Sequence, residues 1–190
     1  SCLQKGQQVL VLVPEIGLTP QTVGRFQRRF AVPVIELHSQ LAEVARAKSW
    51  LTVRQSTPVI VIGTRSAVFA PFANLGMIVV DEEHDLSFKQ LSGLRYSARD
   101  VAVKRAQCDN IPIILGSATP SLESVLNGRK GNYVHLTLSE RVAGSRLPTM
   151  TLLDMRHQVK CNGLSQELID KIRVVLEQDQ QVLIFINRRG

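Results

Sequence analysis

Apolar residues recur along the chain in short runs that have the length of buried β-strands. Val, Ile and Leu dominate these runs, which span residues 8–13, 32–37, 59–62, 77–80, 111–115 and 182–186. Segments of helix length lie between several of them, at residues 19–29, 42–54, 98–106 and 165–178. Strands that alternate with helices predict an α/β fold, in which helices cover both faces of a parallel sheet.

The character of the chain changes after residue 128. A short helix is predicted at 121–126, because Asn127-Gly128 is a typical helix end. The next twenty or so residues are richer in Gly, Arg and polar residues, and we interpret them as a linker with one candidate strand at 133–138. A strand at 149–155 then opens a smaller unit. We expect residues 1–145 to form one domain and residues 146–190 to be a linker with the beginning of a second.

Composition narrows the class of protein. With 190 residues and 44% hydrophobic content the chain can fill one core, which excludes a disordered or fibrous protein. Its 23 Lys and Arg against 16 Asp and Glu give a net charge of +7, which favours a polyanionic partner such as nucleic acid. No apolar run approaches the ~20 residues of a membrane helix, so we expect a cytoplasmic protein without membrane contact. The three cysteines lie far apart and have no zinc-site spacing.

The most informative segment follows the run at 77–80, where the sequence continues Asp81-Glu82-Glu83-His84-Asp85. A buried strand of a parallel sheet brings its carboxyl end to the crevice where ligands bind. In nucleotide hydrolases the first acid there holds Mg²⁺ through water, and the next orients and deprotonates the attacking water. Asp81 and Glu82 are the candidates for these roles. The alternative is a solvated acidic turn.

Three further turns follow predicted strands. Thr19-Pro20 has the residues of a helix start, Thr19 as N-cap and Pro20 in the first turn, and such starts bind phosphates. Thr64-Arg65 repeats the arrangement and adds a guanidinium. Ser117 and Thr119 lie in Gly116-Ser117-Ala118-Thr119-Pro120, so their hydroxyls are expected near Asp81, within hydrogen-bonding reach of the acids or of His84.

Taken together, the motifs resemble a known family. PEIGLTPQ, LHSQLAE, GTRSAVFAPF, DEEHDLSFKQ, LRYSARDVAVKRA, GSATPSLES and NRRG occur in this order. They are similar to the primosomal protein N′ family, the PriA-type replication-restart DNA helicases of superfamily 2. The resemblance covers essentially the whole chain. It implies two RecA-like lobes of the P-loop NTPase type, with most of the first lobe in residues 1–145 and the start of the second after it.

The resemblance also implies a function. Such helicases use ATP and Mg²⁺ to move 3′→5′ on single-stranded DNA, unwind forked DNA and restart stalled replication through primosome assembly. Primosome proteins and single-strand binding protein are the partners implied. It implies catalytic roles for Asp81, Glu82 and His84, coupling roles for Ser117 and Thr119, and DNA contact by Phe88, Lys89, Arg95 and Tyr96. Thr19, Gln21, Thr64 and Arg65 are further DNA-binding candidates, because the two turns that carry them can follow a nucleic-acid backbone.

The loop from Ser87 to Tyr96 corresponds to the family's aromatic-rich loop, which links DNA contact to hydrolysis. Phe88 and Tyr96 have rings that can stack on unpaired bases, and Lys89, Arg95 and Arg99 have charges that can pair with phosphates. Both aromatics could instead be buried anchors of the loop.

Two family features are missing from these 190 residues: a phosphate-binding loop ending Gly-Lys-Thr or Gly-Lys-Ser, and the paired zinc-binding cysteines. We therefore expect an interior fragment that is inactive alone, with zinc only in a downstream part of the parent. Two other hypotheses remain open. One is a non-hydrolysing DNA- or partner-binding domain, and the other is a different superfamily 2 motor, such as a restriction translocase or an RNA helicase.

Overall fold

The computed structural model describes residues 2–139, 148–156, 160–161 and 163–185. The chain divides into two compact units, Ser1–Leu136 and Thr137–Gly190, called unit 1 and unit 2 below. Unit 1 contains the sheet and every predicted site residue. None of the described helices is long and apolar enough to cross a membrane.

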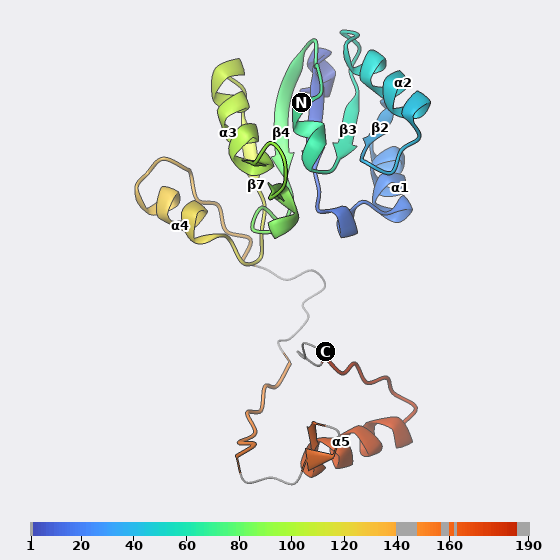
Figure 1. The fold of residues 1–190 in the computed structure, drawn as a ribbon, viewed down its shortest axis with the longest axis vertical. Helices are drawn as coiled ribbons and strands as arrows, with labels where there is room; N and C mark the ends of the chain where they lie inside the picture. Colours follow the sequence, from blue (N-terminus) through green and yellow to red (C-terminus); the bar gives the residue numbers. More distant parts are fainter. Residues whose placement is uncertain (1, 140–147, 157–159, 162, 186–190) are drawn as a thin grey trace. The chain divides into compact units, whose positions relative to one another are not determined.

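Unit 1 is built on a parallel sheet of five strands in the order β2-β3-β1-β4-β7, which confirms the predicted α/β class (Figure 1). The strands are β1 (Gln8–Leu12), β2 (Val34–Leu37), β3 (Ile60–Gly63), β4 (Leu75–Val80) and β7 (Ile113–Leu115). In register, Leu12 of β1 lies beside Gly63 on one side and Val80 on the other. The segments that follow these strands therefore meet at one edge of the sheet, as the sequence predicts.

Helices connect the strands in the predicted places. They are α1 (Pro20–Arg29), α2 (Glu43–Val53), α3 (Ala98–Asp109) and α4 (Leu122–Arg129), with the 3₁₀ turns η1 (Leu3–Lys5), η2 (Glu15–Gly17), η3 (Arg65–Phe69) and η4 (Leu86–Phe88). A two-stranded ribbon of β5 (Lys89–Gln90) and β6 (Tyr96–Ser97) precedes α3. Two helices run past their predicted ends. The helix α3 continues from 106 to Asp109, and α4 continues through Asn127-Gly128 to Arg129.

The sheet is packed on both faces, because successive strand residues point to opposite sides. Leu10, Leu12, Ile78 and Val80 lie on one face in a cluster with Ala98, Ala102 and Ala106 of α3. Val11, Val13, Ile60 and Ile62 lie on the other face, where Phe26 of α1 packs. The spacing of Phe26 and Phe30 predicts that both are core, but Phe30 is 38% exposed and only stacks on Phe26 at 5.9 Å between ring centres.

A tight contact at the end of β3 gives a test of this packing. A Cβ atom on Gly63 would lie 2.5 Å from the backbone oxygen of Leu37, so the strands must shift to admit it. We expect Gly63→Ala to lower the free energy of unfolding by about 1–3 kcal/mol. Gly24→Ala is the matched control, since a Cβ there meets only Arg28 Nη1 at 3.9 Å and alanine favours the helix by about 0.5–1 kcal/mol. Urea unfolding of both variants measures their free energies of unfolding. Equal changes in the two variants would contradict the tight contact at Gly63.

Unit 2 contains β8 (Lys160–Cys161), β9 (Leu164–Ser165) and α5 (Gln166–Glu177). The predicted helix is confirmed, and the Ser165 hydroxyl accepts a hydrogen bond from the Leu168 N–H as its N-cap. Three predicted strands are wrong, because the described residues of these segments form no strand. They are the strands predicted at 133–138, 149–155 and 182–186. An apolar run becomes a strand only when a neighbour supplies hydrogen bonds to its backbone. Residue 186 lies outside the described part.

Candidate active site at the carboxyl edge of the sheet

The segment Asp81–Asp85 follows β4 directly and is held by backbone hydrogen bonds to the ends of two neighbouring strands. Asp81 N–H donates to the Leu12 carbonyl of β1 at 2.9 Å. Gly116, directly after β7, donates to the Val80 carbonyl at 2.8 Å, and its own carbonyl accepts from Glu83 N–H at 3.0 Å. The acidic turn and the turn that begins at Gly116 are thus fixed side by side, as predicted from the sequence.

Glu82 has an unusual backbone conformation, with a φ of 47°. This left-handed region costs roughly 1–2 kcal/mol for a residue other than glycine. Glu82 N–H donates to Asp81 Oδ1 at 3.1 Å, so this bond orients the Asp81 carboxylate. Both residues are exposed to solvent. Strained backbone of this kind clusters at functional sites, which supports a functional interpretation of the turn over a solvated acidic turn.

His84 connects the acidic turn to the turn after β7. Its Nδ1 hydrogen-bonds with Ser117 Oγ at 2.7 Å, and its Nε2 lies 3.4 Å from Thr119 Oγ1. Its Nδ1 also lies 3.6 Å from Glu82 Oε2. The predicted hydrogen bonding of Ser117 and Thr119 with His84 is thereby confirmed. One imidazole ring joins a candidate catalytic acid to both candidate coupling hydroxyls.

The third acid of the segment, Glu83, is the residue that sequence reasoning missed. Only 3% of it is exposed. Its carboxylate accepts hydrogen bonds from Ser121 N–H at 2.6 Å and from the hydroxyls of Ser121 and Ser124, each at 3.0 Å. Arg99 Nη1 of α3 donates to it at 3.1 Å. The sequence gives no signal for which of the four acids is buried. Arg99, predicted to contact phosphate, is 8% exposed and binds Glu83 instead.

Burial and hydrogen bonding act in opposite directions on this carboxylate. Burial, the largest single contribution, raises the pKa of Glu83. The hydrogen bonds from Ser121, Ser124 and Arg99 together outweigh it and hold the pKa below its ordinary value of 4.5. For Arg99, burial lowers the pKa, but its bonds to Asp100 and Glu83 raise it further above its ordinary value. The pair is therefore ionised at neutral pH.

This pair predicts a pH dependence of stability. Because the pKa of Glu83 is lower in the folded state, its contribution is present above pH 4.5 and is lost as the pH falls through the folded value. We expect acidification from pH 7 to pH 3 to destabilise the wild type more than Glu83→Gln, measured as urea midpoints in each buffer. The pKa of Asp85 is also lowered, mainly by the Ser87 N–H, but that contribution is common to both proteins. Parallel pH curves would contradict the prediction.

The loop after the acidic turn divides into a buried base and an exposed tip. Asp85 begins it by accepting from Ser87 N–H at 2.7 Å. Phe88 is 2% exposed within the core, so it is the buried anchor and not, in this conformation, a base-stacking ring as predicted. Tyr96 is half-buried and packs edge-on against Phe69 at 4.9 Å.

The tip of this loop carries the surface that a ligand can reach. Lys89 and Arg95 are exposed there, as a phosphate contact requires. Leu91 and Leu94, which the sequence analysis also missed, lie between these two residues in the chain and are 79% and 78% exposed. Gly93 turns the tip with a φ of +65°. The tip therefore offers two cations flanking two apolar side chains.

The other predicted DNA-binding residues differ in placement. Thr19 caps α1 by accepting from Thr22 N–H at 3.2 Å, and both Thr19 and Gln21 are exposed. Thr64 is 5% exposed, and although it precedes the 3₁₀ turn η3, its side chain makes no capping hydrogen bond there. The predicted phosphate contact of Thr64 is therefore not presented at the surface in this conformation.

Arg65 is also engaged within the protein. Its Nη1 donates to the Ser87 carbonyl at 3.0 Å and to the Lys89 carbonyl at 3.2 Å. It thus holds the base of the loop that ends in the exposed tip. These two carbonyls accept the hydrogen bonds that Arg65 Nη1 would otherwise donate to a DNA phosphate. Phosphate binding by Arg65 stays a prediction.

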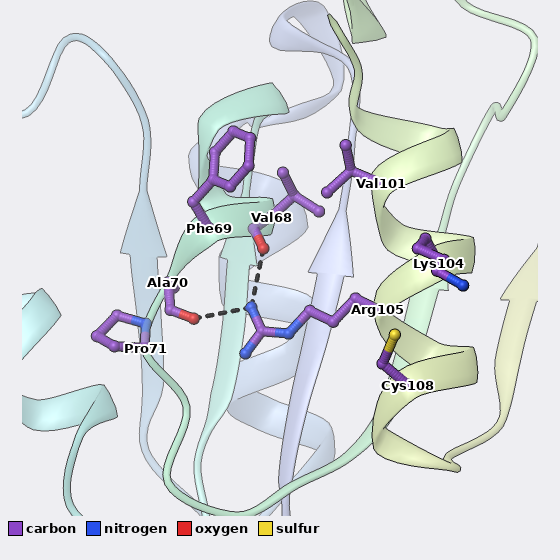
Figure 2. Close-up of a pocket in the computed structure, with 8 residues that line it drawn as sticks. All are labelled: Val68, Phe69, Ala70, Pro71, Val101, Lys104, Arg105 and Cys108. Carbon is purple, nitrogen blue, oxygen red and sulfur yellow. Dashed lines mark hydrogen bonds between the residues drawn. The ribbon is translucent and has the colours of Figure 1, made fainter.

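A larger hollow lies away from this chemistry. A groove of about 480 Å³ between η3 and α3 is lined by Phe69, Val101, Lys104, Cys108 and their neighbours (Figure 2). Arg105 crosses its floor and donates to the Val68 and Ala70 carbonyls, each at 2.8 Å. No residue of the acidic turn lines it, whereas a smaller hollow of about 140 Å³ is lined by Glu83, His84 and Asp85.

The donor set at the acidic turn fits Mg²⁺ better than a metal held by the protein alone. Among the described residues no three His, Cys, Asp or Glu side chains gather as a metal-binding group. Mg²⁺ commonly uses one or two carboxylates, with water and phosphate oxygens completing its shell. Asp81 supplies such a carboxylate. The residues that would hold the phosphates of ATP fit less well, since the 190 residues contain no Gly-Lys-Thr or Gly-Lys-Ser loop.

Comparison with known proteins identifies the family to which this geometry belongs. The sequence profile described as DEAD/DEAH box helicase matches residues 2–127, which include the acidic turn and the turn after β7. The chain belongs to the DEAD/DEAH box helicase family. The second and third letters of this box are Glu and Ala, so Glu83 occupies the place of an alanine.

Curated relatives match the chain from end to end. The replication restart protein PriA of Haemophilus influenzae is 52% identical over 99% of this chain and 26% of its own length. Those of Bacillus subtilis and Chlamydia pneumoniae are 44% and 45% identical, again over 99% of this chain and over 24% and 26% of their own length. The chain thus spans about a quarter of these relatives, and it is similar to a helicase segment of replication restart proteins.

Proposed function

We propose that this chain is the greater part of the ATP-hydrolysing lobe of a replication-restart DNA helicase, which moves 3′→5′ on single-stranded DNA and unwinds forked DNA. The relatives' name and the helicase profile support the general activity. The observation that carries the proposal is the bridge from His84 to Ser117, Thr119 and Glu82. Such a bridge lets a change at the acids reach the segment after β7.

The chain's own residues have distinct roles in this proposal. Asp81 would hold Mg²⁺, and the bound ion would supply positive charge to balance the charge that develops on the transferred phosphoryl group. Glu82 orients the attacking water and takes its proton. His84 holds Glu82 in relation to Ser117 and Thr119. The ligands of the β- and γ-phosphates come from outside these 190 residues.

DNA contact is proposed for the exposed residues of the same edge. Lys89 and Arg95 at the loop tip pair with phosphates, and Thr19 and Gln21 at the start of α1 follow the backbone of the strand. Tyr96 is half-buried and supports the tip. Primosome proteins and single-strand binding protein are the proposed partners of the whole protein, and zinc is proposed only for its other parts.

Strand displacement by the full-length protein tests this function. We expect ATP-dependent release of a labelled strand from a partial duplex with a 3′ single-stranded tail and from a fork, with little release from a 5′-tailed duplex. Excess single-stranded DNA should compete for the protein far better than RNA of the same length. Preference for the 5′ tail would overturn the direction, and preference for RNA would favour another superfamily 2 motor.

The missing phosphate loop favours a second candidate, a DNA- or partner-binding domain that does not hydrolyse ATP. It predicts affinity for single-stranded DNA that falls steeply with salt and does not change when ATP and Mg²⁺ are added. Filter binding at two salt concentrations, with and without nucleotide, distinguishes it from the helicase.

A further inference from the structure

Three segments of unit 1 converge on the single carboxylate of Glu83. The first is the acidic turn itself, since Glu83 directly follows Glu82. The second is the exit of the DNA-facing loop, where Arg99 lies in the first turn of α3, just after β6. The third is the exit of the turn after β7, where Ser121 is the N-cap of α4.

We propose that Glu83 is a positioning residue that couples the DNA-facing loop to the catalytic turn through its buried ion pair with Arg99. The proposal rests on the proposed DNA-stimulated hydrolysis of ATP and adds a residue through which the stimulation passes. Displacement of the loop tip by DNA moves β6 and the first turn of α3. Arg99 carries that movement to Glu83, and hence to Glu82 beside it.

The contacts are arranged as such a coupling requires. Arg99 Nη1 lies 3.1 Å from Glu83 Oε2 and 2.7 Å from Ser121 Oγ, so one guanidinium holds both the acid and the cap of α4. Every buried polar side-chain atom among the described residues has a partner. A fully satisfied buried network is rigid, and losing one member leaves another group unpaired. The side chains of Glu83 and Arg99 are only 1% and 10% exposed, so solvent screens this pair little.

The sequence of the helicase box supports a specific role for this pair. The family name places alanine at the third position of the box, and alanine has no group to bind an arginine. Glu83 is thus not needed for the common chemistry of the first two acids. A buried ion pair adds little net stability on average. The effect expected of the Glu83–Arg99 pair is therefore to position the residues around it.

Glu83→Gln in the full-length protein tests the coupling, because it removes the charge and keeps the volume. We expect the DNA-stimulated kcat for ATP to fall about tenfold to hundredfold, while KM for ATP and Kd for single-stranded DNA stay within about twofold. If Glu83 had a merely structural role, the substitution would change kcat, KM and Kd together or would change none of them. Asp100→Asn is the matched control: Asp100 binds Arg99 Nε at 2.8 Å but does not touch the turn, so stimulation should persist.

Ser124→Ala is a milder second variant that removes only one hydroxyl donor to Glu83, and it decides the question if Glu83→Gln does not fold. We expect it to lower DNA stimulation in the same direction by a smaller factor. Stimulation unchanged in both variants, or lost equally in Asp100→Asn, overturns the coupling. A wild type without any DNA-stimulated hydrolysis would instead overturn the proposed function, so the two failures are distinguishable.

Discussion

Replacing Glu82 by glutamine in the full-length protein is expected to abolish DNA-stimulated ATP turnover while leaving ATP binding intact. Glutamine keeps the shape of the side chain and its place 3.6 Å from His84, but it cannot accept the proton of the attacking water. Loss of a general base typically lowers the rate about 10²–10⁴-fold. Single-turnover hydrolysis measures the chemical step, and binding of a fluorescent ATP analogue measures affinity.

Glu123→Gln is the control for this experiment. Its carboxylate belongs to the same unit and is 61% exposed, and it lies 3.9 Å from Arg99 and not against the carboxylates of Asp81 and Glu82. We expect its turnover to match the wild type. Preserved turnover in Glu82→Gln would remove Glu82 from the mechanism.

Replacing Phe88 by alanine is expected to produce the largest loss of stability. The ring is 2% exposed in the main core cluster, and truncating a buried phenylalanine costs about 3–5 kcal/mol. Phe69→Ala is the matched control, because Phe69 is 46% exposed and should lose much less. Urea unfolding gives both values.

Phe88→Leu distinguishes the anchor from a base-stacking residue even if the alanine variant does not fold. Stacking on a base contributes about 1–3 kcal/mol to binding of single-stranded DNA, and leucine cannot provide it. As a buried anchor, Phe88→Leu should lower stability modestly and leave DNA affinity unchanged. Weaker DNA binding at unchanged stability would restore the stacking role.

The sheet was predictable because its strands are continuous apolar runs. The runs at 8–13 and 59–62 became β1 and β3, which are buried on both faces. The runs at 149–155 and 182–186 look similar in sequence, but their described residues have no strand neighbour. Hydrophobicity identifies a segment that can be buried, whereas strand formation depends on a partner that the pattern does not reveal.

The candidate site was predictable where chemistry depends on position along a strand. Asp81, Ser117 and Thr119 follow parallel strands, so their convergence follows from topology. Whether each polar or aromatic side chain is buried or exposed could not be predicted from the topology. Glu83 and Phe88 lie within a few residues of exposed Glu82 and Lys89, and only the direction of each side chain in a tight turn separates buried from exposed.

The most direct test of the account is ATP hydrolysis by the 190-residue chain and by the full-length protein, each with and without single-stranded DNA. We expect DNA-stimulated hydrolysis by the full-length protein and none by the 190-residue chain, which contains the acids but no Gly-Lys-Thr or Gly-Lys-Ser loop. Hydrolysis by the 190-residue chain that disappears in Asp81→Ala would contradict the account, because the phosphates would then be held by residues within it.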